Sequence, residues 1–117
     1  MIEVRACLGA DGVLRRVDSS GHAGTGSAGR DLVCAAVSVL LRTAYEVLAQ
    51  VPGTRVEGSA PEPGSLWFSL RDYPPGDADR LKGIGDFLLT GLSGLEREYP
   101  GALKLTMERH WREGYGS

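Results

Sequence analysis

The sequence predicts an α+β fold, a two-layer sandwich in which two helices cover one face of a mainly antiparallel sheet. Three observations predict it. Five short segments are expected to be extended, three of them with alternating apolar and polar residues, and two longer segments have the composition or spacing of helices. Their order along the chain is β-β-α-β-β-α-β. Pairs of adjacent strands separated by single helices are typical of such a sandwich.

Strands are predicted where apolar side chains recur with a period of two. The first covers residues 2–8, and an Asp-Gly turn signal joins it to a second over 13–18 as a hairpin. A second hairpin covers 54–71 around a Pro-Glu-Pro-Gly turn, and a last strand begins at Leu103. Within the second hairpin, three apolar residues share one face of a strand: Leu66, Phe68 and Leu70.

Two helices are predicted. Residues 32–50 lack Gly and Pro and are rich in Ala, Leu and Val, with Asp31 as the expected N-cap and Pro52 just beyond the end. The second helix is predicted from apolar residues at spacings of three and four. They are Leu81, Ile84, Leu88, Leu92, Leu95 and Tyr99.

The composition indicates a single domain over residues 1–117, with the polar tail at 112–117 expected to be disordered. The formal net charge of −2 disfavours nucleic-acid binding. No signal or transit pattern begins the chain, and the longest apolar run, 32–41, is half of the ~20 residues that a membrane span requires. Two cysteines without a secretory signal favour reduced thiols and a cytoplasmic location.

The chemistry is predicted between the first hairpin and the first helix. Residues 19–29 are rich in glycine and small residues and are expected to form a mobile loop that carries His22. If Asp31 caps the helix, Cys34 lies in the first turn, where unpaired N–H groups and the helix dipole stabilise a thiolate. A loop imidazole that folds back can pair with this thiolate and protonate a leaving amine. The pattern predicts a Cys–His dyad that needs no metal or cofactor.

Other interpretations of these residues stay open. Residues 24–29 match G-x-G-x-x-G, but a helix follows where a dinucleotide site needs a strand that ends in an acid. His22, Asp31 and Cys34 supply three candidate zinc ligands, whereas structural zinc generally takes four. A cysteine in an Ala-rich helix also serves packing alone, and Cys7 on a strand is interpreted that way. The main alternative function is therefore a noncatalytic α+β interaction module.

One continuous stretch resembles a family signature. Gly21-His22-Ala23, a glycine-bearing loop and then Gly29-x-Asp31-Leu32-Val33-Cys34-Ala35-Ala36-Val37-Ser38 are similar to the motif of Prp, the bacterial ribosomal-processing cysteine proteases. The chain length, the order of elements and the segment 91–100 fit the family as well. Leu32 stands where the family often has Ile, which preserves an apolar site.

The resemblance implies a homodimeric cytoplasmic peptidase that removes the N-terminal extension of a large-subunit ribosomal protein, cutting after a hydrophobic, Phe-containing sequence. The family's nucleophile falls on Cys34 and its histidine on His22. Asp31 either caps the helix or orients His22, and Ser38, one turn after the nucleophile, lines the site or packs the helix. The loop that gates substrate would include Gly21, Ala23, Gly24, Gly26 and Gly29.

Overall fold

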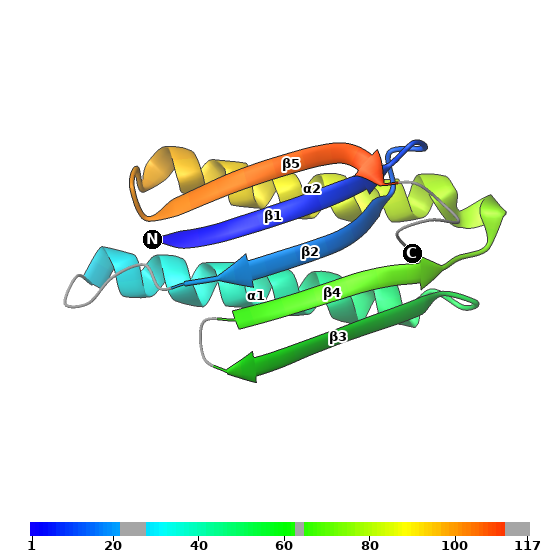
Figure 1. The fold of residues 1–117 in the computed structure, drawn as a ribbon, viewed down its shortest axis with the longest axis horizontal. Helices are drawn as coiled ribbons and strands as arrows, with labels where there is room; N and C mark the ends of the chain where they lie inside the picture. The colour runs from blue at the N-terminus through cyan, green and yellow to red at the C-terminus, as the bar shows by residue number, and fades with distance from the viewer. Residues whose placement is uncertain (22–27, 63–64, 112–117) are drawn as a thin grey trace.

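A computed structural model describes residues 1–21, 28–62 and 65–111, with backbone only at 28–31, 61–62 and 110–111. The predicted order β-β-α-β-β-α-β is confirmed, with one short 3-10 helix added before the second α-helix (Figure 1). The elements are β1 (Ile2–Gly9), β2 (Leu14–Ser20), α1 (Ala28–Gln50), β3 (Arg55–Glu62), β4 (Ser65–Asp72), η1 (Pro75–Asp77), α2 (Ala78–Glu98) and β5 (Leu103–Trp111).

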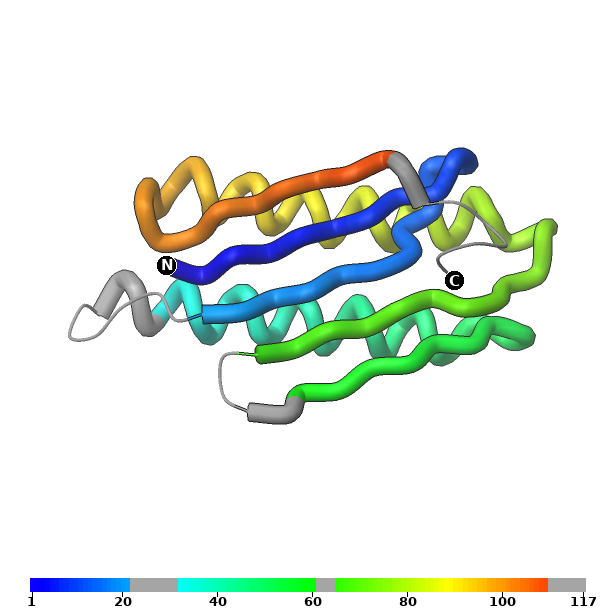
Figure 2. Tube along the Cα trace, viewed as in Figure 1, coloured from blue at the N-terminus to red at the C-terminus, as the bar shows by residue number. Residues whose placement is uncertain are grey.

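The described strands form one sheet in the order β3-β4-β2-β1-β5. The pairs β1–β2, β2–β4 and β3–β4 are antiparallel, whereas β1 and β5 run parallel. The first and last strands of the chain therefore lie side by side (Figure 2). The sheet is mixed, and its antiparallel pairs predominate as predicted.

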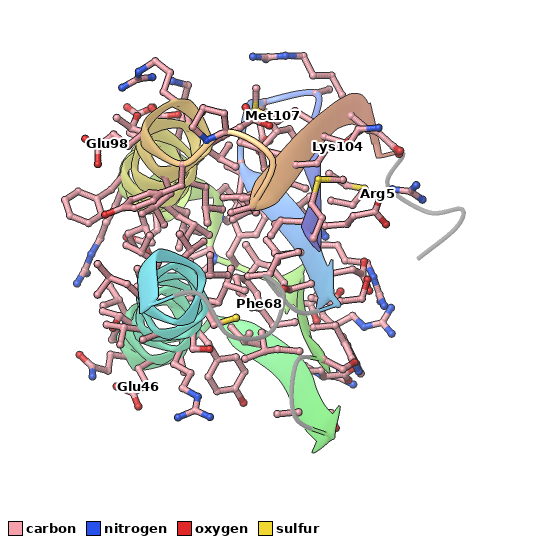
Figure 3. All side chains as sticks on the ribbon, turned by 90° about the vertical axis from the view of Figure 1, so that its left-hand side faces the viewer. Arg5, Glu46, Phe68, Glu98, Lys104 and Met107 are labelled. Atoms are coloured by element: carbon pink, nitrogen blue, oxygen red, sulfur yellow. The ribbon has the colours of Figure 1, made fainter. Side chains whose placement is uncertain are left out.

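Both helices cover the same face of this sheet (Figure 1). Since β2 and β3 are each antiparallel to β4, they run in the same direction, and α1 is the crossover that connects them. By the same reasoning α2 connects the parallel strands β4 and β5. Viewed along the strands, Phe68 lies between the sheet and α1, while Arg5 and Lys104 lie on the opposite, open face (Figure 3).

The core fills the space between the helices and the sheet. In β1 the alternate residues Ile2, Val4 and Ala6 are buried, which confirms the period-two pattern. The second predicted helix is also confirmed, because its apolar stripe faces the core. The buried residues of α1 recur at spacings of three and four: Val33, Val37, Leu41, Ala44 and Leu48.

The start of α1 corrects one prediction. The helix begins at Ala28, so Asp31 is a residue of the first turn and not the N-cap. Ala28 and Arg30 have high helix propensity, and no proline stands between them and Cys34, so the helix extends back into the segment expected to be loop. Asp31 as a cap is therefore wrong, and its suggested role in orienting His22 stays a prediction.

The apolar stretch of α1 is longer than the run noted in the sequence. Leu32–Gln50, 19 residues with a mean hydropathy of 1.7, is long and apolar enough to cross a membrane by length and composition alone. Core helices pass the same test, and α1 packs five residues into the core. Apolar side chains also lie on the outer side of α1, where Leu32 and Val39 are more than half exposed.

Candidate active site

The predicted site lies where β2 ends and α1 begins, at one end of the sandwich (Figure 1). The chain leaves the sheet at Ser20 and enters the helix at Ala28. Between them, the predicted residues His22, Ala23, Gly24 and Gly26 lie outside the described residues. Their roles as base and as gating loop stay predictions.

Gly21, the first residue of this connection, has a backbone that requires glycine. Its φ is +91°, and a Cβ atom placed there would lie 2.5 Å from the carbonyl oxygen of Met1. A side chain would be both strained and in collision with the backbone. The chain therefore depends on glycine where it turns away from β2 toward His22.

Cys34 lies at the margin of the core. It is half-buried and packs against the core cluster, between the fully buried Val33 and the exposed Ala35. Neither Cys34 nor Cys7 forms a disulfide. As a residue, Cys34 is therefore neither fully buried nor part of a disulfide, and a nucleophilic role requires both conditions.

The earlier start of α1 also changes the surroundings expected for Cys34. It is the seventh residue of a helix that begins at Ala28, not a residue of the first turn. The effect of the helix dipole falls off within the first turn, and the N–H groups without partners inside the helix belong to residues 28–31. The first-turn position expected for Cys34 is therefore wrong, and its pairing with His22 stays a prediction.

Cys7 has a different environment. It lies on the open face of the sheet, where its Sγ donates a hydrogen bond to Oε2 of Glu108 at 3.7 Å. Burial and the negative charge of Glu108 raise the pKa of the Cys7 thiol. Cys7 is held as the neutral thiol, which supports its interpretation as a noncatalytic residue.

The remaining predicted residues lie on α1. Ser38 is exposed and follows Cys34 by one helical turn, so both lie on the same side of the helix. Gly29 and Asp31 belong to the first turn of α1, and only their backbone is described. Ser38 as a site-lining residue stays a prediction.

Sequence reasoning missed a cavity beside this side of α1. Its volume is about 270 Å³, and we call it the α1–β3 pocket. Six of its lining residues are Arg42, Tyr45, Glu46, Gly58, Ala60 and Leu66. A signal was present in the sequence, because Ser38, Arg42 and Tyr45 follow Cys34 at helical spacings of four, four and three.

The described part of the chain contains no group of three or more His, Cys, Asp or Glu side chains placed to hold a metal ion. The zinc hypothesis involves His22 and the side chain of Asp31, which lie outside that part. The chemistry that we propose below uses the thiol of Cys34.

An α+β sandwich with a half-buried thiol on its first helix fits a class, the small thiol-dependent enzymes. The chain belongs to the cysteine protease Prp family, whose model matches residues 1–104. It is therefore a cysteine peptidase, and the noncatalytic alternative is not retained. No curated protein sequence gives a significant match.

Solved structures have the same fold. SMU.848 from Streptococcus mutans is 25% identical with a TM-score of 0.76, over 94% of this chain and 96% of that one. The ribosomal processing protease Prp from S. aureus, with a covalently linked product peptide, is 24% identical with a TM-score of 0.75, over 92% and 100%. The protease chain in the structure with a substrate peptide is 23% identical to this chain, with the same TM-score and coverage.

Proposed function

We propose that the chain is a cytoplasmic endopeptidase that removes the N-terminal extension of a large-subunit ribosomal protein, with Cys34 as nucleophile and His22 as its base. The observation that carries the proposal is the half-buried thiol of Cys34 on α1 in a chain of the cysteine protease Prp family. The similar S. aureus protein is described as an essential ribosomal processing protease, which supports the substrate class.

The chemistry follows from these groups. The thiolate of Cys34 attacks the scissile carbonyl, and a C–S bond forms while the carbonyl oxygen becomes an oxyanion. Protonated His22 gives its proton to the leaving amine as the C–N bond breaks. Water then hydrolyses the thioester and releases the second product.

The test is cleavage of the host's own ribosomal precursor peptide, followed by mass spectrometry. Wild type is expected to cut it at one bond, Cys34→Ala and His22→Ala to lose cleavage by at least about a thousandfold, and Cys7→Ala to retain it. Cys7→Ala is the matched control, because it removes the other thiol of the chain. Equal cleavage by wild type and Cys34→Ala would refute the assignment.

The proposal includes a homodimer, and the outer side of the helix layer supports it. Val39 on α1 is 63% exposed and Phe87 on α2 is 76% exposed. Both line a groove of about 620 Å³ between the two helices, together with Leu40, Val47 and Ile84. Exposed apolar surface of this kind marks a protein interface, and the outer side of the helices is where we place the second copy.

Light scattering coupled to size-exclusion chromatography tests this interface. Phe87→Glu places a charge on the groove and is expected to convert the dimer to a monomer. Met107→Glu is the matched control, because Met107 is 51% exposed and lies on β5, outside the helix layer. A monomeric wild type, or a dimer insensitive to Phe87→Glu but disrupted by Met107→Glu, would contradict the placement.

A further inference from the structure

We propose that the outer edge of β5 is complementary to the same strand of a second copy of the chain, and that Glu96 holds this edge closed. The edge takes no part in the proposed peptidase chemistry. Its occupant would be an antiparallel β5 strand, and one carboxylate on α2 excludes that strand.

β5 lies at one end of the sheet. In the order β3-β4-β2-β1-β5, one side of β5 pairs with β1, in a register that sets Val4 beside Leu105. The other side is an edge of the sheet that the described strands form. Backbone N–H and C=O groups on such an edge can pair with a strand of another chain, and folded proteins use charged side chains to prevent it.

A carboxylate lies on this edge. Glu96, two residues before the end of α2, is half-buried, and its Oε2 accepts a hydrogen bond from the Leu105 N–H at 2.8 Å. The Leu105 N–H thus donates to a helix side chain, and we infer that it points away from β1. Glu96 therefore occupies the position that a carbonyl oxygen of an added strand would take.

The direction of this N–H group determines which groups the edge offers. The N–H and C=O groups of one residue in a strand point to the same side, and the side alternates along the strand. Since the Leu105 N–H points outward, the backbone groups of Met107 point outward as well. Leu105 and Met107 are therefore the residues through which an added strand would form its hydrogen bonds.

The sequence of β5 is complementary to itself. If two β5 strands pair antiparallel about a twofold axis at Thr106, Leu105 lies opposite Met107 of the partner subunit, in a hydrogen-bonded pair. In the same register Lys104 lies opposite Glu108 of the partner subunit, so a cation faces an anion on each side of the axis. Met107 is 51% exposed, and the pairing would cover it. These features favour a second copy as the occupant.

This register requires the N–H group that Glu96 already binds. The Leu105 N–H would have to donate to the carbonyl oxygen of Met107 of the partner subunit, but it donates to Glu96. An ionised carboxylate has no donor to offer the carbonyl groups of the incoming strand, and its charge would lose water when the strand covers it. Glu96 therefore disfavours the pair, and its removal is expected to open the edge.

The experiment traps the pair as a disulfide. Thr106→Cys is made in a chain that also carries Cys7→Ala and Cys34→Ala, so that it has a single thiol. Opposed residues of a pair without hydrogen bonds have Cα atoms about 4.5 Å apart, within the range of a disulfide. With oxidised glutathione as the oxidant, Glu96→Ala is expected to accelerate formation of the covalent dimer by at least about tenfold.

Two matched controls accompany this variant. Glu98→Ala removes an exposed carboxylate two residues away on α2, and the rate of cross-linking should stay within about twofold. Lys104→Cys places the single thiol on the same open face, but the two copies of residue 104 would be about 13 Å apart along the strands, too far for a disulfide. This second control should not cross-link, with or without Glu96.

Hydrogen exchange on the unmodified protein tests the closed edge without a variant. The Leu105 amide is expected to exchange at least about tenfold more slowly than the Met107 amide, because only the former has Glu96 as acceptor. Equally fast exchange of the two amides would overturn the role of Glu96. Circular dichroism melting of each variant verifies that it is folded.

The cross-linking outcomes decide the pairing. Equal cross-linking at residues 104 and 106, or cross-linking at 106 that Glu96→Ala does not accelerate more than Glu98→Ala does, would overturn the proposed register or its control by Glu96. None of these outcomes depends on the peptidase activity, which cleavage of the precursor peptide measures separately.

Discussion

The Sγ of Cys7 and Oε2 of Glu108 lie 3.7 Å apart on the open face of the sheet, opposite the face that the buried residues of β1 share with the helices. The two thiols of the chain are thereby placed in separate environments. Burial and the Glu108 carboxylate hold Cys7 protonated, whereas Cys34 lies on α1 at the edge of the core. One thiol is protected from reaction, and the other is the one for which we propose the role of nucleophile.

The first prediction concerns the protection of Cys7. Glu108→Gln removes a negative charge that raises the pKa of this thiol, so alkylation of Cys7 by iodoacetamide at about pH 8 should accelerate by roughly two- to fivefold. Peptide mass spectrometry distinguishes the two cysteines in one sample, and the rate at Cys34 serves as the internal control. An equal change at both thiols would indicate general unfolding and contradict the local explanation.

The second prediction concerns a buried cation. Arg15 is 2% exposed, and its guanidinium donates hydrogen bonds to the carbonyl oxygens of Leu70 and Arg71, each at 3.0 Å. Arg15→Ala leaves those acceptors without this donor and should lower the free energy of unfolding by about 2–3 kcal/mol. Arg16→Ala, which breaks the partly exposed ion pair with Asp18 and the contact of its guanidinium with the Trp67 ring, should cost less, about 1 kcal/mol. Urea unfolding measures both, and equal losses would contradict the account.

The third prediction compares two glycines. Gly21→Ala places a Cβ against the Met1 carbonyl at a positive φ, so it should destabilise the fold by at least about 1 kcal/mol and reduce peptidase activity. Gly83→Ala adds a methyl group on α2 with nothing within 4 Å, so it should stabilise the fold by about 0.5–1 kcal/mol. Thermal unfolding measures whether each variant is destabilised or stabilised. If Gly21→Ala left the stability unchanged, the turn would relax without cost and the prediction would be contradicted.

The fourth prediction concerns pH. Burial opposes ionisation of Asp11, but hydrogen bonds from the Tyr73 hydroxyl and from the Val13 N–H, the latter at 3.0 Å, outweigh it and lower the pKa of this carboxyl below 3.8. Because the folded state binds the proton more weakly, Asp11 stabilises the fold above about pH 4, and this contribution is lost as the pH falls through the lowered pKa.

Asp11→Asn should therefore destabilise the protein by about 0.5–1 kcal/mol at pH 7 and by less near pH 3. The urea midpoint at each pH measures this difference. A destabilisation by Asp11→Asn that grows toward acid pH would contradict the lowered pKa of Asp11. Asp86→Asn, which affects an exposed pair with Lys82 on α2, is the control and should show little change.

The local patterns of the sequence predicted most of the fold. The alternation in β1 and the apolar stripe of α2 arise from neighbouring residues, so the period of the pattern identified each element. The start of α1 was misjudged because a glycine-rich sequence normally indicates a loop. In the structure, Ala28 through Arg30 are already helical and form the beginning of α1. Helix ends depend on such marginal differences in propensity.

The candidate site was predictable only in part. The half-buried position of Cys34 on a helix could be predicted, because it depends only on the pattern of the residues around it. The α1–β3 pocket depends on Gly58 of β3 lying against Tyr45 of α1, a pairing that is set by the insertion of β4 between β2 and β3 in the sheet. No local pattern encodes that order of strands. The outer groove around Phe87 likewise appears only when both helices are placed together.

The most direct measurement is the covalent intermediate itself. The protein is mixed with the ribosomal precursor peptide, quenched in acid before turnover is complete, and digested for mass spectrometry. The account predicts that the acyl group of the extension is attached through a thioester to the peptide that contains Cys34. Attachment to Cys7, or cleavage that persists in Cys34→Ala with no adduct on any thiol, would contradict it.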